Sequence, residues 1–520
     1  MILDQIDETS KTREPIEPTS PAELDLPASW LRALTGLAQT VETAAREGEA
    51  AHCVEKAVWA QMLSLGHDVL QQFFDRVGNG DLGERFEQPD GRVLRRLPKT
   101  RIRPYLSIFG AFELPRAVYG TREKQKIQRV PLDERLQLPD GKFSLVLQDW
   151  NQQLAVENTY ATVAQTLERI LGLRQSVDSL ERMSRNMAEP VSDYWDGLEA
   201  PPPKEEGELQ VLSADGKGVP MRRSASTMPI EGHAPKTGPK PGGKKMALIG
   251  ASYSVDPHPR TPEEVTDALF QRPGTKTSQA DRPPRPLPRH KRLRASLARS
   301  ESGTTEPATI EIFGWLAKEE QERAPGSLPL VLMDGQISLW EAAAKMLPKN
   351  RVEILDLLHV TPRLWKAAYL FHPKEGPNAT RFVRERVLKI LRGNTRSVIT
   401  GLRRMATVSG LTGRKRKSLE RICGYFENNL DRMRYGEYLA AGYPIATGVI
   451  EGACRHLVKD RLERAGMQWV EEGAQAILDL RSVHLSGKWE EFQAYRNEKE
   501  QERLYPDRET LESVEWPLAA

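Results

Sequence analysis

Three carboxylates in this chain have the residue type and setting to bind divalent metal ions. Asp215 and Asp334 each follow an apolar run and precede a glycine, in LSADGKG and LVLMDGQ. Glu451 lies in GVIEGACRHLVKDRLER, among several cationic side chains. Carboxylate oxygens are the ligands that Mg²⁺ and Mn²⁺ prefer, and two such ions about 3.5–4 Å apart can activate an attacking oxygen and stabilise a leaving one. Three acids are what two-metal phosphoryl transfer needs.

Each of these acids also has an ordinary structural explanation. Asp-Gly is a common turn dipeptide, so Asp215 and Asp334 could simply end strands. Glu451 borders an apolar helical stripe and could form an i,i+4 ion pair with Arg455, worth only about 0.2–0.5 kcal/mol. In open α/β sheets, however, ligands bind beyond the C-terminal ends of strands, where a following glycine lets them approach the backbone. The pattern alone leaves both interpretations open.

The elements that must position these acids are predicted by hydrophobic periodicity. In chain order they are a strand from Leu209 to Asp215, a strand at 244–255, a strand in HKRLRASLA, a helix at 308–324, a buried strand that ends at Asp334, a strand in NRVEILDLLHV, a helix that starts near Thr361-Pro362, basic helices from about Ala379 to Ala440, and a helix at 473–485. Strands followed by helices indicate an α/β core with a helical insertion.

The first part of the chain is predicted to be mainly helical. Apolar residues recur at helical spacing over 51–77, and RPYLSIFGAFELPRAVYG alternates around Gly110 in the manner of a β-hairpin. Further on, Gly172 can end one helix and Ser176 can N-cap the next. This pattern resembles a helix-turn-helix, whose second helix would enter a DNA groove, although an ordinary helical hairpin has the same pattern.

These signals divide the chain of 520 residues into several parts. We predict a disordered tail at 1–27, an N-terminal α+β region at 28–142, a helix-turn-helix-like region at 143–198, a Pro-rich linker at 199–208, the first part of the core at 209–375, a helical insertion at 376–445, a closing catalytic helix region at 446–490 and a charged tail at 491–520.

Composition excludes several classes of protein. The 75 Lys and Arg nearly balance the 72 Asp and Glu, so any electrostatic attraction must come from local clusters. Three separated cysteines form no CxxC pair, which argues against disulfide and zinc scaffolds and fits a reducing cytosol. No apolar run approaches the ~20 residues that span a bilayer, and no Walker loop, GxSxG or HExxH motif occurs. We therefore expect a cytoplasmic protein with no membrane partner.

Five blocks of the sequence resemble the insertion-sequence transposases of the ISKra family. They are LSADGKGVPM, KKMALIGASYSVDPHPRTPEEV, LVLMDGQISLW, EILDLLHVTPRLWKAA and GVIEGACRHLVKDRLERAGMQW, and they occur in the family's order and spacing. The resemblance covers most of the chain from about Phe143 to Leu485. One departure is TPRLW, where the family sequence is closer to EYLW. That departure touches none of the three acids.

The resemblance implies an α/β RNase H-like catalytic core with a helical insertion, preceded by a mainly α DNA-binding region. It implies that Asp215, Asp334 and Glu451 are the catalytic DDE residues and ligate two Mg²⁺ or Mn²⁺ ions. Asp356 and His359, in DLLH, match an accessory element near the site. The implied function is cleavage and strand transfer of DNA at the ends of an insertion sequence, in a bacterial, nucleoid-associated setting.

Contact with DNA is expected from local basic clusters, because phosphate contacts dominate affinity. The predicted DNA-binding residues are Arg455, Lys459, Arg461, Arg289, Lys291, Arg292, Arg414, Lys415, Arg416 and Lys417. The expected partners are double-stranded terminal inverted repeats and target DNA. Because two ends must be brought together, we expect a homo-oligomer in the DNA complex. The alternatives are a catalytically silent DNA-binding protein derived from a transposase and an RNase H-like nuclease that cannot join strands.

Overall fold

The structure of the chain is a computed structural model, and it describes residues 27–88, 91–121, 127–222, 243–270, 284–297, 306–323, 328–374, 376–446, 448–511 and 516. The chain forms two compact units. Unit 1 comprises Met1–Asp149, Gln165–Arg174 and Glu498–Ala520, and unit 2 comprises Trp150–Ala164 and Gln175–Asn497. The predicted tail at 1–27 lies outside the described residues except for its last position.

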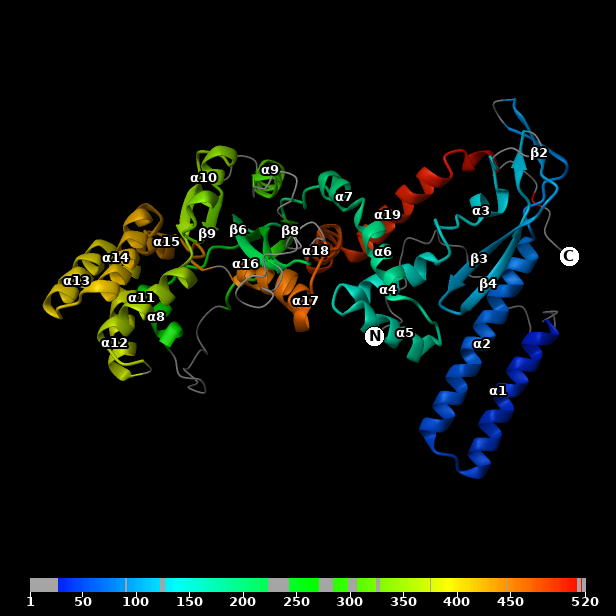
Figure 1. Cartoon of the computed structure of the whole chain (residues 1–520), viewed down its shortest axis with the longest axis horizontal. Coiled ribbons are helices and arrows are strands. Elements are labelled where there is room, and N and C mark those ends of the chain that lie inside the picture. The colour runs from blue at the N-terminus through cyan, green and yellow to red at the C-terminus, as the bar shows by residue number, and fades with distance from the viewer. Residues whose placement is uncertain are drawn as a thin grey trace, which may run out of the picture. The chain divides into compact units, whose positions relative to one another are not determined.

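Unit 1 packs a β-hairpin against a long helix (Figure 1). Its elements are α1 (Ala28–Glu47), α2 (Ala51–Val77), β1 (Arg85–Glu87), β2 (Val93–Arg96), β3 (Arg101–Ser107), β4 (Gly110–Arg116), β5 (Tyr119–Gly120) and α3 (Pro131–Arg135). Phe74 of α2 makes edge contacts with the rings of Tyr105 and Phe112, at centroid distances of 5.6 and 5.3 Å. The predicted helix at 51–77 and the hairpin at Gly110 are both confirmed.

Unit 2 is built around one five-stranded mixed sheet. Its strands are β6 (Leu209–Pro220), β7 (Lys244–Val255), β8 (Arg289–Leu297), β9 (Leu330–Met333) and β10 (Val352–Leu355). Their order is β10-β9-β6-β7-β8, in which β6, β7 and β8 are antiparallel neighbours while β9 and β10 run parallel to β6. The predicted α/β core is therefore present, and β7 has the predicted bounds.

Helices cover both faces of this sheet. Successive side chains of its strands point to opposite faces, and both faces carry buried apolar residues. Leu212 and Met333 face α9 (Glu306–Arg323) and α10 (Ile337–Met346). Val211 and Leu332 face the opposite side, towards α11 (Leu357–Phe371) and the helices that follow it. Figure 1 shows α9 and α10 on one side of the sheet and α11 and α8 (Pro262–Phe270) on the other.

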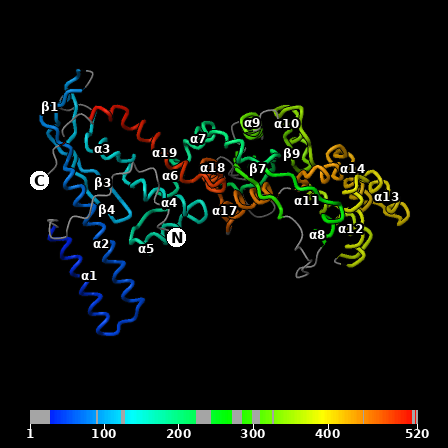
Figure 2. Tube along the Cα trace, turned by 180° about the vertical axis from the view of Figure 1, so that it is seen from behind, coloured from blue at the N-terminus to red at the C-terminus, as the bar shows by residue number. Residues whose placement is uncertain are grey.

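The predicted helical insertion consists of α12 (Pro377–Leu391), α13 (Thr395–Val408), α14 (Gly413–Asn428), the short turn η3 (Leu430–Arg432) and α15 (Tyr435–Ala440). Figure 2 shows α12, α13 and α14 gathered beside α11. Phe382, Leu402 and Phe426 join the same buried cluster as Ile354 of the sheet. The insertion therefore shares a continuous hydrophobic core with the strands that carry the candidate site.

Five further helices have their bounds as follows. They are α4 (Leu145–Ala155), α5 (Tyr160–Leu171), α6 (Val177–Ala188), α7 (Val191–Gly197) and α18 (Glu471–Leu485). Gly172 ends α5 with a φ of 70°, and the Ser176 side chain caps α6 by accepting a hydrogen bond from Ser179 N, as predicted. Helix α6 packs on α18 through Met187 and Leu480, so its apolar face belongs to unit 2.

Residues 491–520 were predicted to form a charged tail, but the first part of this region belongs to a packed helix. Residues 489–504 form α19 (Trp489–Leu504), which is followed by the short turn η6 (Arg508–Leu511). Phe492 is fully buried in a cluster with Tyr194 and Trp195, because one apolar side of this charged helix has neighbours that are distant in sequence. In the described part of the chain, no helix is both long enough and apolar enough to cross a membrane.

Candidate active site

Asp215 lies on β6, and Asp334 directly follows the neighbouring strand β9, near the middle of the sheet. The position of Asp334 is the predicted one. The parallel register pairs Val211 with Leu330 and Leu212 with Val331. Continuing that register by three residues brings Asp215 level with Asp334. Two acids that are more than a hundred residues apart in sequence thus meet beside each other.

Asp215 does not end its strand, which corrects the prediction of an Asp-Gly turn. Strand β6 continues to Pro220, and Asp215 pairs with Ile249 of β7. The reason is that Gly216 and Gly218 stay extended and pair with Leu248 and Met246 of the equally long β7. Asp215 therefore projects from a continuous strand, whereas Asp334 sits in a loop.

The loop that holds Asp334 is fixed by hydrogen bonds. Gln336 N donates to Asp334 Oδ1 at 2.9 Å, and the indole Nε1 of Trp340 donates to the Asp334 carbonyl at 2.7 Å. Because α10 begins at Ile337, both bonds come from the first turns of that helix or from its cap. The carboxylate is thereby anchored to α10 and remains partly exposed.

The environment of Asp215 disfavours its negative charge. Burial raises the pKa of Asp215, hydrogen bonds from Cys454 and Gly216 lower it, and the charge of Asp334 raises it again, with a net upward shift. A neighbouring carboxylate acts in this direction because two like charges oppose each other. A cation placed between the two carboxylates would stabilise their negative charges.

Glu451 reaches the same neighbourhood through a different element. It lies on α16 (Gly448–Ala453), which continues directly into a π-helical turn, η4 (Cys454–Lys459), and then α17 (Asp460–Leu462). Cys454 Sγ donates to Asp215 Oδ2 at 3.3 Å. Burial raises the pKa of the Cys454 thiol, and the charges of Asp215 and Glu451 add to the shift. Both acids are thus close enough to act on one thiol, and π-turns within helices are frequent at functional sites.

Asp215 and Asp334 have the donor chemistry that a divalent metal ion prefers. Asp215 and Asp334 supply hard oxygen donors and repel each other, which is the chemistry that Mg²⁺ or Mn²⁺ satisfies. Glu451 is exposed. Among the residues that the structure describes, no group of three or more His, Cys, Asp or Glu side chains is arranged to hold a metal ion. Glu451 therefore does not join the two aspartates in one ligand group here.

The accessory pair lies at the same edge of the sheet. Asp356 follows β10, is buried, and caps α11 by accepting a hydrogen bond from Leu358 N at 2.7 Å. The predicted start of this helix near Thr361 was therefore four residues late, because Asp356 provides the cap. His359, one turn into α11, is close enough for its charge to lower the pKa of Asp215.

The cations near Glu451 divide into exposed and buried residues. Arg455 and Lys459 are exposed, and Arg455 Nε lies 3.7 Å from Asp460 Oδ1 rather than pairing with Glu451. Arg461 is fully buried, donates to the Ala155 carbonyl at 2.8 Å, and its guanidinium stands near the rings of Tyr160 and Trp469. The prediction that Arg461 contacts DNA is wrong, because its side chain is enclosed by its own fold.

Strand β8 shows the same division. Arg289 is exposed and pairs with Asp256 at 2.5 Å, and Lys291 is half-buried, with a pKa that burial lowers. Arg292 is 3% exposed and donates to Glu319 at 2.9 Å. The DNA-binding prediction for Arg292 is therefore also wrong, because a buried carboxylate of α9 neutralises its charge.

The basic cluster of the insertion lies in the first turns of α14. Arg414, Lys415 and Lys417 are exposed, and among the described residues no acidic side chain pairs with them. Arg416 is half-buried and pairs with Glu420 at 3.1 Å. Three cations near the positive end of a helix dipole are repelled by that dipole. A bound anion such as phosphate would reduce this electrostatic repulsion.

Sequence reasoning missed two groups that the fold brings to this region. Lys217 is half-buried on β6 two residues after Asp215, and its charge lowers the pKa of Cys454. Strand alternation could have identified it, since residues i and i+2 share a face. Tyr425 of α14 lies against Gly335, and the Arg363 guanidinium stands 3.4 Å from the centre of its ring. No local pattern marks Tyr425, because its neighbours come from α10 and α11.

The enclosure of Cys454 predicts slow chemical modification. We expect N-ethylmaleimide at neutral pH to modify Cys53 at least about tenfold faster than Cys454, because thiolate is the reactive form and burial beside two acids suppresses it. Cys53 is partly exposed, whereas Cys454 is buried. Mass spectrometry of timed samples measures both rates, and labelling in denaturant provides the control. Equal rates in the folded protein would contradict the described contact between Cys454 and Asp215.

Comparison with protein-family models finds no match for this chain, and comparison with curated proteins finds none either. The resemblance to the ISKra transposases therefore remains a prediction from the sequence blocks.

Proposed function

We propose that the protein is a DDE transposase that binds the ends of an insertion sequence and catalyses metal-dependent DNA cleavage and strand transfer. The observation that carries the proposal is that Asp215, on β6, comes level with Asp334, directly after β9, and that burial together with the charge of Asp334 raises the pKa of Asp215. An aspartate whose pKa is raised by burial and by a neighbouring carboxylate is a candidate functional group, and α/β sheets bind ligands beyond the C-terminal ends of their strands.

The architecture supports an RNase H-like core. Three antiparallel strands followed by two strands parallel to the first, with helices on both faces, are compatible with that fold. The candidate acids lie on β6, directly after β9, and on the helix that follows the insertion. This sequence of elements is the one that the family resemblance implies.

Within this proposal, each group has a defined task. Bound Mg²⁺ would activate the attacking oxygen and stabilise the leaving oxygen of the phosphodiester. Asp215 and Asp334 would hold it. The family resemblance assigns Glu451 as the third ligand, although the described structure does not group it with the two aspartates. Arg455, Lys459 and the exposed cations of α14 would contact the DNA backbone.

The test uses duplex DNA that carries the sequences flanking this reading frame. Cleavage that requires Mg²⁺ and is abolished by EDTA is expected, and joining of pre-cut ends to a target duplex is expected to follow. Binding without cleavage would indicate a silent DNA-binding protein instead. Cleavage without joining would indicate a nuclease, and absence of both binding and cleavage would overturn the proposal.

A further inference from the structure

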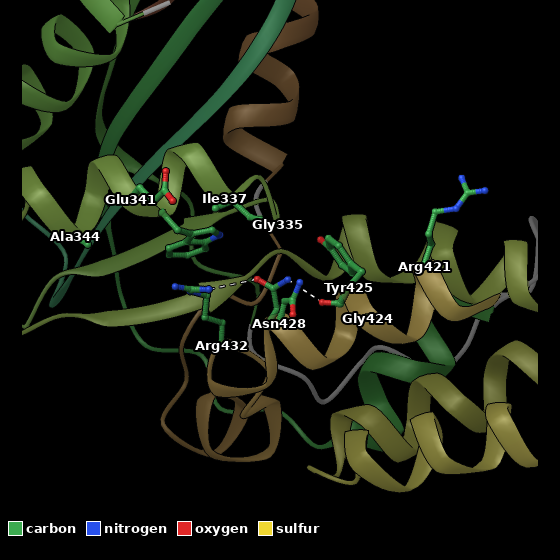
Figure 3. Close-up of a pocket in the computed structure, with 11 residues that line it drawn as sticks. Gly335, Ile337, Glu341, Ala344, Arg421, Gly424, Tyr425, Asn428 and Arg432 are labelled. Atoms are coloured by element: carbon green, nitrogen blue, oxygen red, sulfur yellow. Dashed lines mark hydrogen bonds between the residues drawn. The ribbon is translucent and has the colours of Figure 1, made fainter. Parts of the chain in front are cut away.

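A cavity of about 740 Å³ lies beside Asp334, between α10 on one side and α14 and η3 on the other. Figure 3 shows Gly335, Ile337 and Glu341 along one wall, with Tyr425, Asn428 and Arg432 facing them. Gly335 is the next residue after Asp334, and Trp340, which also lines the cavity, donates to the Asp334 carbonyl. The cavity thus shares a wall with the candidate active site.

The lining combines aromatic rings with cations. The Arg432 guanidinium stands 4.2 Å from the centre of the Trp340 ring and is held there by an ion pair with Glu353 at 2.7 Å. Tyr425 provides a second ring at the end nearer Asp334. Nucleobases are bound in this way, by stacking on aromatic and guanidinium planes.

The remaining groups are free to recognise a ligand. Among the described residues, the Asn428 amide, the Glu341 carboxylate and the Arg421 guanidinium have no hydrogen-bond or ion-pair partner, and all three are exposed at the cavity. An amide and a carboxylate can bond to the donors and acceptors on a base edge. A cation at the entrance suits a phosphate.

Tyr425 is held in place by its surroundings. A methyl group at residue 335 would overlap the Tyr425 ring, so the absence of a side chain at Gly335 is what lets the ring approach the strand end. Burial raises the pKa of Tyr425 to about 12, with Arg363 opposing the shift and Asp334 adding to it. The phenol therefore stays neutral at physiological pH, while its oxygen is buried, so the ring rather than the hydroxyl is what Tyr425 offers to a ligand.

We propose that this cavity binds an unstacked nucleotide of the DNA substrate, with its base against Tyr425 and the Trp340–Arg432 pair and its phosphate near Arg421. The volume lies within the about 300–1,000 Å³ that is usual for small-ligand sites, and one nucleotide fits such a space. The inference rests on the proposed function, because the ligand is part of the DNA that would be cut at Asp334.

The experiment measures base-dependent affinity of the full chain by fluorescence anisotropy. The probes are a labelled oligothymidylate of about twelve nucleotides and an oligonucleotide of equal length with abasic residues in place of the bases. Wild type is expected to bind the intact probe about tenfold more tightly, which is the scale of one stacked base. Asn428→Ala and Tyr425→Leu are expected to reduce this ratio to near one.

The matched control is Arg414→Ala, which removes a cation from the same helix but outside the cavity. It is expected to weaken both probes equally and leave their ratio unchanged. Asn428 is exposed, so Asn428→Ala should fold normally, and thermal unfolding checks this for all variants. Three outcomes would overturn the inference. The protein could bind only duplex DNA, wild type could bind the intact and abasic probes equally, or the affinity ratio could stay unchanged in both cavity variants.

The two proposals fail separately. If the protein cleaves and joins DNA ends but shows no base preference, the proposed function stands and the proposal of a nucleotide-binding cavity is refuted. If the protein shows a base preference that Asn428→Ala removes, but no Mg²⁺-dependent cleavage, the proposal of a nucleotide-binding cavity stands and the proposed transposase function is refuted.

Discussion

Replacing Asp334 with asparagine is expected to abolish Mg²⁺-dependent cleavage of the element ends while end binding persists. The amide keeps the oxygen that accepts the hydrogen bond from Gln336 N, so the loop should retain its shape. It removes the charge that would hold a divalent ion. A loss of several kcal/mol of transition-state stabilisation corresponds to about a 1,000-fold slower reaction. Asp215→Asn is expected to have the same effect.

Gel electrophoresis of cleaved duplex gives the rate, and a gel shift without metal gives the affinity. The matched control is Asp460→Asn, because Asp460 is a nearby acid that pairs with Arg455 and His456 and has no role in the proposed ligand set.

Glu451→Gln tests whether Glu451 is the third metal ligand or a surface residue outside the site. A loss as large as for the aspartates would assign it as the third ligand, and unchanged cleavage would remove it from the site.

The sequence predicted elements whose signals are local. The apolar run at 244–255 coincides with β7, and the acid after LVLM lies where that strand ends. Asp215 was misplaced at a strand end because Asp-Gly is read as a turn, whereas the long partner β7 keeps both glycines of β6 extended. Pairing with a distant strand decided the outcome, and no local pattern carries that information.

The same limit explains the errors among the cations. Arg461 and Arg292 lie in basic runs that look solvated, but each is enclosed by elements far away in the chain. Their partners are the Ala155 carbonyl and Glu319. Arg455 and Lys459, on the same segment as Arg461, stay exposed because they lie on the side of the helix away from Leu457. Charge runs thus predict where cations occur, while packing decides which of them can reach DNA.

Helix α9 is attached to the sheet by a buried charge network that includes the Arg292–Glu319 pair and that the sequence did not reveal. Arg323, 1% exposed, donates to Glu206 at 2.7 and 2.9 Å, to Glu319 at 3.2 Å and to Ser252 at 3.1 Å. Ser254 also donates to Glu206. The network links the last turn of α9 to β7 and to the segment before β6, and so it holds in place the strand that carries Asp215.

Arg323→Met is expected to lower the free energy of unfolding by about 3–5 kcal/mol, because it removes the arginine that pairs with Glu206 and one of the two arginines, Arg323 and Arg292, that pair with Glu319. The matched control is Lys318→Met on the same helix. It removes a half-exposed ion pair with Glu322, at 3.7 Å, and a hydrogen bond to the Asp196 carbonyl, and it is expected to cost only about 1 kcal/mol. Urea unfolding followed by circular dichroism measures both variants. If Arg323→Met lowered the free energy of unfolding no more than Lys318→Met, the network would not have the stabilising role described.

The difference between wild type and Arg323→Met should depend on pH in a defined direction. Burial acts to raise the pKa of Glu206, but hydrogen bonds from Arg323 and Ser254 outweigh it, and the net shift is downward. A carboxylate with a lowered folded-state pKa stabilises the protein above its unfolded pKa of about 4.3, and this contribution is lost as pH falls through the folded value. The stability gap should therefore be full at pH 7 and should narrow below about pH 4.3. A gap that stayed constant with pH would show that packing of the arginine, rather than its charge, fastens α9 to the sheet.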